Sequence, residues 1–176
     1  QKKFEFSHLV RNPFQCAASM LTQGFYTGGS ANYVRTSVIH GNDPKVAFPQ
    51  FNTEFDSFTP YEKCLYHWVE LNRFLLNFHG HKGFRGLYKF EQLYGNGPSG
   101  LDDFASMVIG RPMQVASKQA YDQVQRQLSE PIKLHNYKLV DIVVETATKL
   151  GYELSELQSS FDIDVLNSLY SSKRLS

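Results

Sequence analysis

Apolar side chains recur at helical spacing most plainly in residues 59–81. One face of this stretch carries Cys64, Trp68, Leu71, Leu75 and Phe78. The other face carries Glu62, Tyr66, Glu70, Arg73 and Asn77. This pattern predicts an amphipathic helix over residues 60–79, with its Trp68 side inside the protein and its Arg73 side in water.

The ends of this helix are also marked in the sequence. Thr59 is suited to cap the first turn, and Pro60 is suited to the first helical position, where a backbone N–H has no helical partner. Gly80 offers the left-handed conformation that often ends a helix. We expect the other helices to pack around this central one.

A second strong apolar pattern covers residues 136–150 and predicts another core helix, which should pack against the first. Weaker patterns predict short helices, at residues 13–24, 87–95, 99–109, 117–130 and 163–170. Residues 2–10 alternate weakly and suit either a short strand or an irregular segment.

A small β element is expected in the N-terminal third. Residues 33–40 and 45–51 flank a Gly41-Asn42-Asp43-Pro44 turn and predict the two arms of a β-hairpin. The region is rich in aromatic residues, namely Tyr26, Tyr33, Phe48, Phe51, Phe55 and Phe58. These rings suit either a protein interface or a layer that covers the central helix.

The composition favours one folded domain over residues 1–176. Hydrophobic residues make up 41% of the 176 positions, which is too many for a disordered chain. The fold class that we predict is mainly α, α+β in detail: a single helical domain around a central amphipathic helix, with the small hairpin. The apolar runs are shorter than the ~20 residues that cross a bilayer, so we expect a cytoplasmic protein without membrane contact.

The net charge of +1 gives no overall attraction to nucleic acids, so any such binding must be local. Cys16 and Cys64 both fall on apolar helix faces, and we expect them to be reduced thiols. His79 and His81 form a His-x-His pair, but a metal site needs further ligands at a recognisable spacing. We therefore expect no metal and no cofactor.

Arg73 and His79 are the candidate catalytic residues. Their Arg-x5-His spacing resembles the motif of the HEPN-type ribonucleases, which are helical bundles, over these few residues only. The resemblance implies that His79 acts as general acid or base on RNA and that Arg73 stabilises phosphate charge. The alternative is structural: Arg73 pairs with Glu70 on the helix surface, and His79 favours the helix C-terminus.

Residues 79–89 mix cations, glycines and aromatic rings, as single-stranded nucleic acid binders do. The candidate nucleic-acid-binding residues are Lys82, Phe84, Arg85, Tyr88 and Lys89. In this hypothesis, bases stack on the two rings while the three cations contact phosphates. In the alternative, the rings fill the core and the cations stay solvated.

The leading functional hypothesis is a non-enzymatic protein-interaction module, acting as a subunit, adaptor or regulator of a larger assembly. Its partner is expected to be another protein chain or a second copy of this one. The alternative is a nucleic-acid-binding protein with single-stranded RNA as its partner, including a HEPN-like ribonuclease that uses Arg73 and His79. The sequence favours the first because it lacks a complete catalytic constellation.

Overall fold

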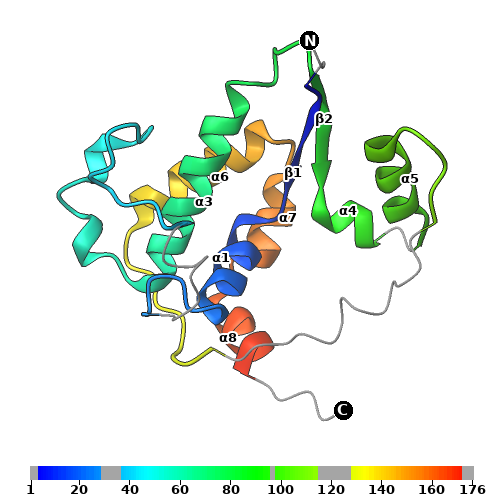
Figure 1. Ribbon diagram of the computed structural model, residues 1–176. Coiled ribbons are helices and arrows are strands. Elements are labelled where there is room, and N and C mark those ends of the chain that lie inside the picture. Colours follow the sequence, from blue (N-terminus) through cyan, green and yellow to red (C-terminus); the bar gives the residue numbers. More distant parts are fainter. Residues whose placement is uncertain (1–3, 29–36, 96–97, 115–127, 172–176) are drawn as a thin grey trace. The chain divides into compact units, whose positions relative to one another are not determined.

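The computed structural model describes residues 4–28, 37–95, 98–114 and 128–171 (Figure 1). The helices are α1 Pro13–Thr22, α3 Pro60–Leu76, α4 Phe90–Gly95, α5 Pro98–Ile109, α6 Tyr137–Lys149, α7 Leu154–Ser160 and α8 Ile163–Ser171. The strands are β1 Phe6–Val10 and β2 Phe84–Lys89, and two short 3-10 helices cover Pro49–Phe51 and Phe55–Ser57. The protein is therefore mainly α with a small β component, as predicted.

The chain forms two compact units. The helical unit comprises Asn12–His81 and Arg126–Ser176, and the sheet unit comprises Gln1–Arg11 and Lys82–Gln125. The boundary at residues 81 and 82 falls inside the segment that was singled out for nucleic acid binding. A single domain over residues 1–176 stays a prediction.

Helix α3 begins as the sequence predicts. The Thr59 hydroxyl accepts a hydrogen bond from the Glu62 N–H at 3.2 Å, and the Glu62 carboxylate accepts one from the Thr59 N–H at 2.7 Å. This reciprocal pair is a capping box, and Pro60 occupies the first helical position. The end differs from the prediction: the helix stops at Leu76, and Gly80 does not adopt a left-handed conformation.

The Trp68 side of α3 is buried as predicted at Cys64 and Trp68, which are 0% and 3% exposed, but Leu71 and Phe78 of the same predicted face are exposed. The prediction that the opposite side faces water is wrong for the N-terminal part of α3, whereas Asn77 just after the helix is exposed. Glu62 and Glu70 are 2% and 5% exposed, and Tyr66 between them is fully buried. The N-terminal part of α3 is therefore enclosed on every side.

Two helices of the helical unit cover α3. Helix α1 packs closely on α3 through buried side chains that include Phe14, Ala17 and Ala18. Helix α6 packs on α3 as well, so the predicted pairing of the two strongest helices is confirmed. The small alanine side chains allow α1 to approach α3 closely, which favours dense packing.

Buried carboxylates explain why α3 is enclosed. The Glu62 carboxylate accepts hydrogen bonds from the N–H groups of His135 and Asn136, at 2.6 and 2.7 Å. It thereby connects the start of α3 to the residues that lead into α6. The Glu70 carboxylate connects α3 to another segment, because it accepts hydrogen bonds from the Ala47 and Phe48 N–H groups at 2.6 and 2.9 Å.

The predicted β-hairpin over residues 33–51 is wrong in its described part. Residues 45–48 are irregular and Pro49–Phe51 is a 3-10 helix, while residues 33–36 lie outside the described chain. The Ala47 and Phe48 N–H groups bond to a carboxylate instead of to a second strand, and Pro49 has no N–H to donate. The rings of Phe51, Phe55 and Phe58 are buried around Tyr66, so they cover α3 rather than form an exposed interface.

The β structure lies in the sheet unit, where β1 and β2 pair in parallel. Phe6 lies opposite Phe84 and His8 lies opposite Leu87, so β2 contains one extra residue in this interval. Such a β-bulge reverses the alternation of side chains along the strand. Helix α4 follows β2 directly, and α5 packs on α4.

The remaining helix predictions have mixed outcomes. Helices α6 and α8 occur where the apolar patterns placed them, whereas α7 was not predicted. Gly151 ends α6 with φ of 81°, and the Tyr152 N–H bonds to the Ala147 carbonyl in the manner of a Schellman cap. Most of the predicted helix over residues 117–130 lies outside the described residues.

We predict that Glu62→Gln lowers the free energy of unfolding by roughly 3 kcal/mol, because a buried amide replaces a carboxylate that holds three backbone N–H groups. Urea unfolding measures this loss. Glu156→Gln is the matched control, since Glu156 closes the exposed capping box of α7. The control should lose less than about 1 kcal/mol, and equal losses would contradict the assigned role of Glu62.

Candidate functional site

Arg73 lies in the last full turn of α3. Its guanidinium carbon is 5.6 Å from the centre of the Phe48 ring, in a cation–π contact. The expected pair with Glu70 does not form, because that carboxylate binds the Ala47 and Phe48 N–H groups. Among the described residues, no group accepts a hydrogen bond from the Arg73 guanidinium.

His79 lies in the turn that follows α3, where its N–H bonds to the Leu76 carbonyl at 3.2 Å. Partial burial lowers the pKa of the imidazole below its usual value. The side chain is therefore neutral at pH 7, and a neutral imidazole can accept a proton. A shared catalytic role for Arg73 and His79 stays a prediction.

The five candidate nucleic-acid-binding residues belong to the sheet unit. Phe84 contacts Phe6 with ring centres 5.7 Å apart, and Tyr88 contacts Phe104 at 5.2 Å. The strand register separates the two rings: Phe84 lies opposite Phe6, whereas Tyr88 lies opposite Leu9 and so points to the other face of the sheet. The two rings therefore do not form one stacking surface.

Gly86 lies in the irregular part of β2 and explains why the strand can change direction there. Its φ of 146° is rarely adopted by other residues, and a Cβ at this position would lie 3.3 Å from the Tyr88 ring. The glycine that made the segment look like a flexible loop is thus part of a strand with a bulge.

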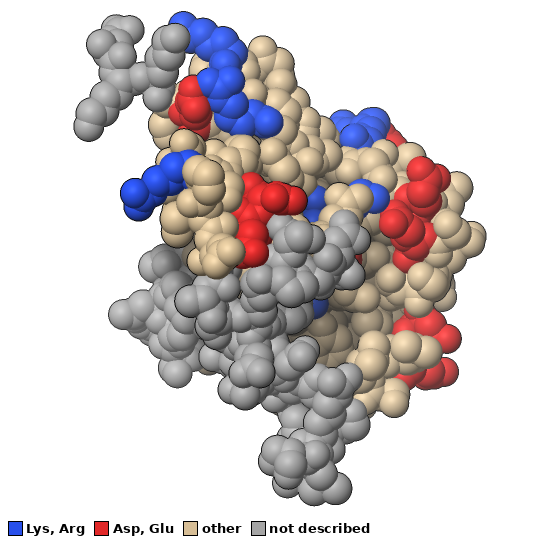
Figure 2. All heavy atoms as spheres, turned by 90° about the vertical axis from the view of Figure 1, so that its right-hand side faces the viewer, with Lys and Arg blue, Asp and Glu red and all other residues tan. Residues whose placement is uncertain are grey.

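The cations of this segment are distributed rather than clustered. Arg85 forms an ion pair with Glu5 of the adjacent chain segment, Lys82 is exposed before β2, and Lys89 is partly buried at its end. Figure 2 shows basic side chains beside acidic ones on the face in view. The local positive potential that was expected from the sequence is therefore reduced by neighbouring carboxylates.

The C-terminal half of α3 and the turn that follows it expose large apolar side chains. Leu71, Phe74 and Phe78 are 44%, 56% and 39% exposed, and the rings of Phe74 and Phe78 are 5.1 Å apart. Leu71 and Phe74 lie on one side of the helix, and Phe78 lies in the turn after it. We call these three residues the apolar stripe.

A hollow of about 470 Å³ lies at the C-terminal end of α3. It is lined by Ala47, Arg73, Leu76, Asn77 and Lys149. Lys149 is the last residue of α6 and pairs with Glu145 one turn earlier. The hollow thus brings together a guanidinium, an ammonium and a carboxamide from the ends of two helices.

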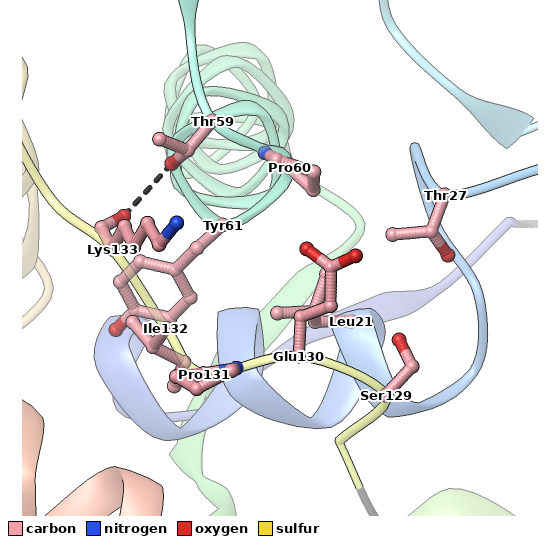
Figure 3. A pocket seen from close by; sticks show the side chains of 10 residues that line it. All are labelled: Leu21, Thr27, Thr59, Pro60, Tyr61, Ser129, Glu130, Pro131, Ile132 and Lys133. Carbon is pink, nitrogen blue, oxygen red and sulfur yellow. Dashed lines mark hydrogen bonds between the residues drawn. The ribbon is translucent and has the colours of Figure 1, made fainter.

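Another hollow, of about 450 Å³, opens at the start of α3 (Figure 3). The Thr59 hydroxyl donates to the Lys133 carbonyl at 2.8 Å, and Figure 3 shows the Glu130 carboxylate pointing toward Pro60 and Thr27. The charged side chains of the lining are Glu130 and Lys133, which are opposite in sign. This hollow therefore selects neither anions nor cations by charge.

A buried polar contact beside α3 was not anticipated from the sequence. The Tyr26 hydroxyl donates to the Ile39 carbonyl at 2.7 Å and accepts from the Ile39 N–H at 3.1 Å. It also lies 3.3 Å from Nδ1 of His67. Tyr26 has a left-handed backbone with φ of 59°, which is uncommon for a tyrosine and indicates strain held by the surrounding packing.

Burial is the largest influence on the pKa values of His67 and Tyr26. It lowers the pKa of His67 from 6.5 to about 4 and raises the pKa of Tyr26 well above its usual value. Both groups are therefore uncharged at neutral pH, and their contact fixes the segment around Ile39 against α3. Local sequence patterns could not reveal this contact, since Tyr26, Ile39 and His67 are far apart along the chain.

Two further findings concern the described chain as a whole. No group of three or more His, Cys, Asp or Glu side chains in it is arranged to hold a metal ion. None of its helices is long and apolar enough to span a membrane. Cys16 and Cys64 are free thiols, and burial raises the pKa of Cys64 well above its usual value.

The chain matches no protein family model, no curated protein and no solved structure.

We predict that the stability of the protein falls by about 3 kcal/mol as the pH decreases from 6.5 to 4, through the contribution of His67. The unfolded chain binds a proton at His67 in this range and the folded protein does not, so lower pH favours unfolding. Urea unfolding across this range measures the slope. His67→Gln should reduce it, exposed His135→Gln should leave it unchanged, and equal slopes for all three proteins would contradict the assignment.

Proposed function

We propose that this protein is a non-enzymatic protein-interaction module, a cytoplasmic subunit, adaptor or regulator of a larger assembly. The observation that supports the proposal is the apolar stripe of Leu71, Phe74 and Phe78. A helix that is enclosed over its N-terminal part and then exposes large apolar side chains in its last turns and in the turn after it offers a surface for another protein.

The apolar stripe is a better candidate than the aromatic residues of the predicted hairpin. Phe51, Phe55 and Phe58 are buried in the helical unit, so they are not accessible to a partner. Phe74 and Phe78 contact one another and present their remaining ring surface to solvent. Aromatic side chains in such a position commonly contribute much of the energy of a protein interface.

RNA binding or cleavage is the alternative proposal. The neutral His79 and the guanidinium of Arg73 are its main support, together with exposed Lys82. The pairing of Arg85 with Glu5 and the separation of Phe84 from Tyr88 weaken it. We therefore rank the interaction module first.

We predict that Phe74→Ser reduces partner capture by at least about tenfold, because it removes an exposed ring from the centre of the interface. The measurement is capture from a cell lysate on immobilised protein of residues 1–176, quantified by mass spectrometry. Val165→Ser, at a 47% exposed position on α8, is the matched control. Melting temperatures of both variants should stay within a few degrees of the original protein.

Equal capture by the original protein and by Phe74→Ser would remove the apolar stripe from the proposal. Cleavage of single-stranded RNA that is lost in a folded His79→Ala variant would instead favour the ribonuclease. Salt-dependent RNA binding that is lost in Lys82→Ala, without cleavage, would favour the nucleic-acid-binding protein.

A further inference from the structure

We propose that the hollow at the start of α3 binds a short peptide of two or three residues as a zwitterion, with its ammonium group at Glu130 and its carboxylate at Lys133. All of the residues that line this hollow belong to the helical unit, and its volume is about 450 Å³. Pockets that hold small molecules commonly measure about 300–1,000 Å³. No residue of the apolar stripe lines it, so this site is separate from the surface under the proposed function.

The chain segment that carries both charges is fixed by hydrogen bonds of its backbone. The Asn167 side chain of α8 accepts from the Ile132 N–H at 2.7 Å and donates to the Ile132 carbonyl at 3.4 Å. The Thr59 hydroxyl donates to the Lys133 carbonyl at 2.8 Å. Pro131 adds a fixed φ angle, and Ile132 is only 3% exposed. This wall of the hollow is therefore formed before a ligand arrives, which lowers the entropic cost of binding.

One side of the hollow offers oxygen acceptors and a negative charge. Figure 3 shows the Glu130 carboxylate and the hydroxyl groups of Thr27 and Ser129 on the side away from Thr59 and Lys133. Among the described residues, these three side chains have no hydrogen-bond or ion-pair partner. An ammonium group has three N–H donors and no acceptor. This side therefore suits the amino terminus of a peptide.

The opposite charge lies at the other end of the same segment. Lys133 is exposed, and its ammonium group has no ion-pair partner in the part of the chain that the structure describes. Its N–H donors suit the carboxylate at the other terminus of a peptide. Glu130 and Lys133 are the charged side chains of the lining, so no further lining charge competes with either terminus.

The separation of the two charges determines the length of the ligand. Glu130 and Lys133 are three residues apart in a segment without helix or strand, so their Cα atoms are at most about 10 Å apart. An extended peptide spans about 3.3–3.6 Å per residue, so the termini of two or three residues fit within that distance. A free amino acid carries both charges on one residue and fits less well. Pro60 and Pro131 are exposed and offer apolar contact to the side chains of the peptide.

The test compares four probes: the dipeptide leucyl-leucine, its N-acetyl derivative, its C-terminal amide and free leucine. Binding to protein of residues 1–176 is measured by ligand-observed NMR, which detects weak complexes. We expect leucyl-leucine to bind most tightly. Each blocked derivative should bind about two- to fivefold more weakly, because it lacks one charge that an exposed side chain recognises. High salt should reduce these differences.

Two variants assign the termini of the dipeptide to residues. In Glu130→Gln the N-acetyl derivative should bind as well as the unmodified dipeptide, and in Lys133→Gln the amide should do so. Asp141→Asn and Lys138→Gln, at exposed positions of α6 outside the hollow, are matched controls that should keep both differences. Glu130 and Lys133 are exposed, so both variants should melt within a few degrees of the original protein.

Other outcomes overturn the inference. Equal binding of all four probes, or no binding of leucyl-leucine, does so directly. Differences that persist in both Glu130→Gln and Lys133→Gln place the dipeptide elsewhere and also overturn it. Tighter binding of free leucine than of the dipeptide overturns the length of the ligand. Phe74→Ser should leave dipeptide binding unchanged, so this result is independent of the lysate experiment on the apolar stripe.

Discussion

The helical unit depends on two carboxylates that are buried on one helix. Glu62 and Glu70 lie two turns apart on α3, and each binds consecutive backbone N–H groups of a segment without regular structure. A buried carboxylate is costly unless it receives such hydrogen bonds, and a buried N–H is costly unless it finds an acceptor. Each carboxylate accepts hydrogen bonds from backbone N–H groups that need an acceptor, so each glutamate fixes one of the two segments against α3.

This arrangement also determines what α3 presents to solvent. The segment bonded to Glu70 places Phe48 beside Arg73, and the segment bonded to Glu62 leads into α6, whose far end brings Lys149 to the same hollow. The candidate site is therefore assembled from parts of the chain that are remote in sequence. The buried carboxylates position it without taking part in binding.

Local signals were sufficient to predict α6, most of α3 and the cap at the start of α3, because helix starts and apolar periodicity are properties of short segments. They failed where a distant group decided the outcome. Glu70 appeared to be a surface residue because its N–H partners lie more than twenty residues away. Residues 84–86 appeared to be a loop and residues 87–89 the start of a helix, and both predictions are wrong because these residues form β2. The partner strand β1 lies more than seventy residues earlier in the sequence, so local patterns could not reveal the pairing.

The candidate site also depends on residues that are distant in the sequence. Arg73 and His79 were chosen by their spacing in the sequence, but the surroundings of Arg73 come from Phe48 and Lys149, which spacing cannot reveal. Leu71 and Phe78 of the apolar stripe were predicted to lie on the buried face of the helix, whereas Phe74 was not assigned to a face. The stripe is exposed because α1 and α6 pack on other parts of α3, and this packing cannot be seen in a short segment of sequence.

The parallel pairing of β1 with β2 has a consequence for the order in which the chain acquires its structure. Because residues 11–83 separate the two strands, closing that loop costs entropy before any hydrogen bond of the sheet is gained. A two-stranded sheet is barely stable by itself. During synthesis, β1 therefore cannot pair until β2 has left the ribosome. Packing of α1 on α3 before that point shortens the loop that has to be closed.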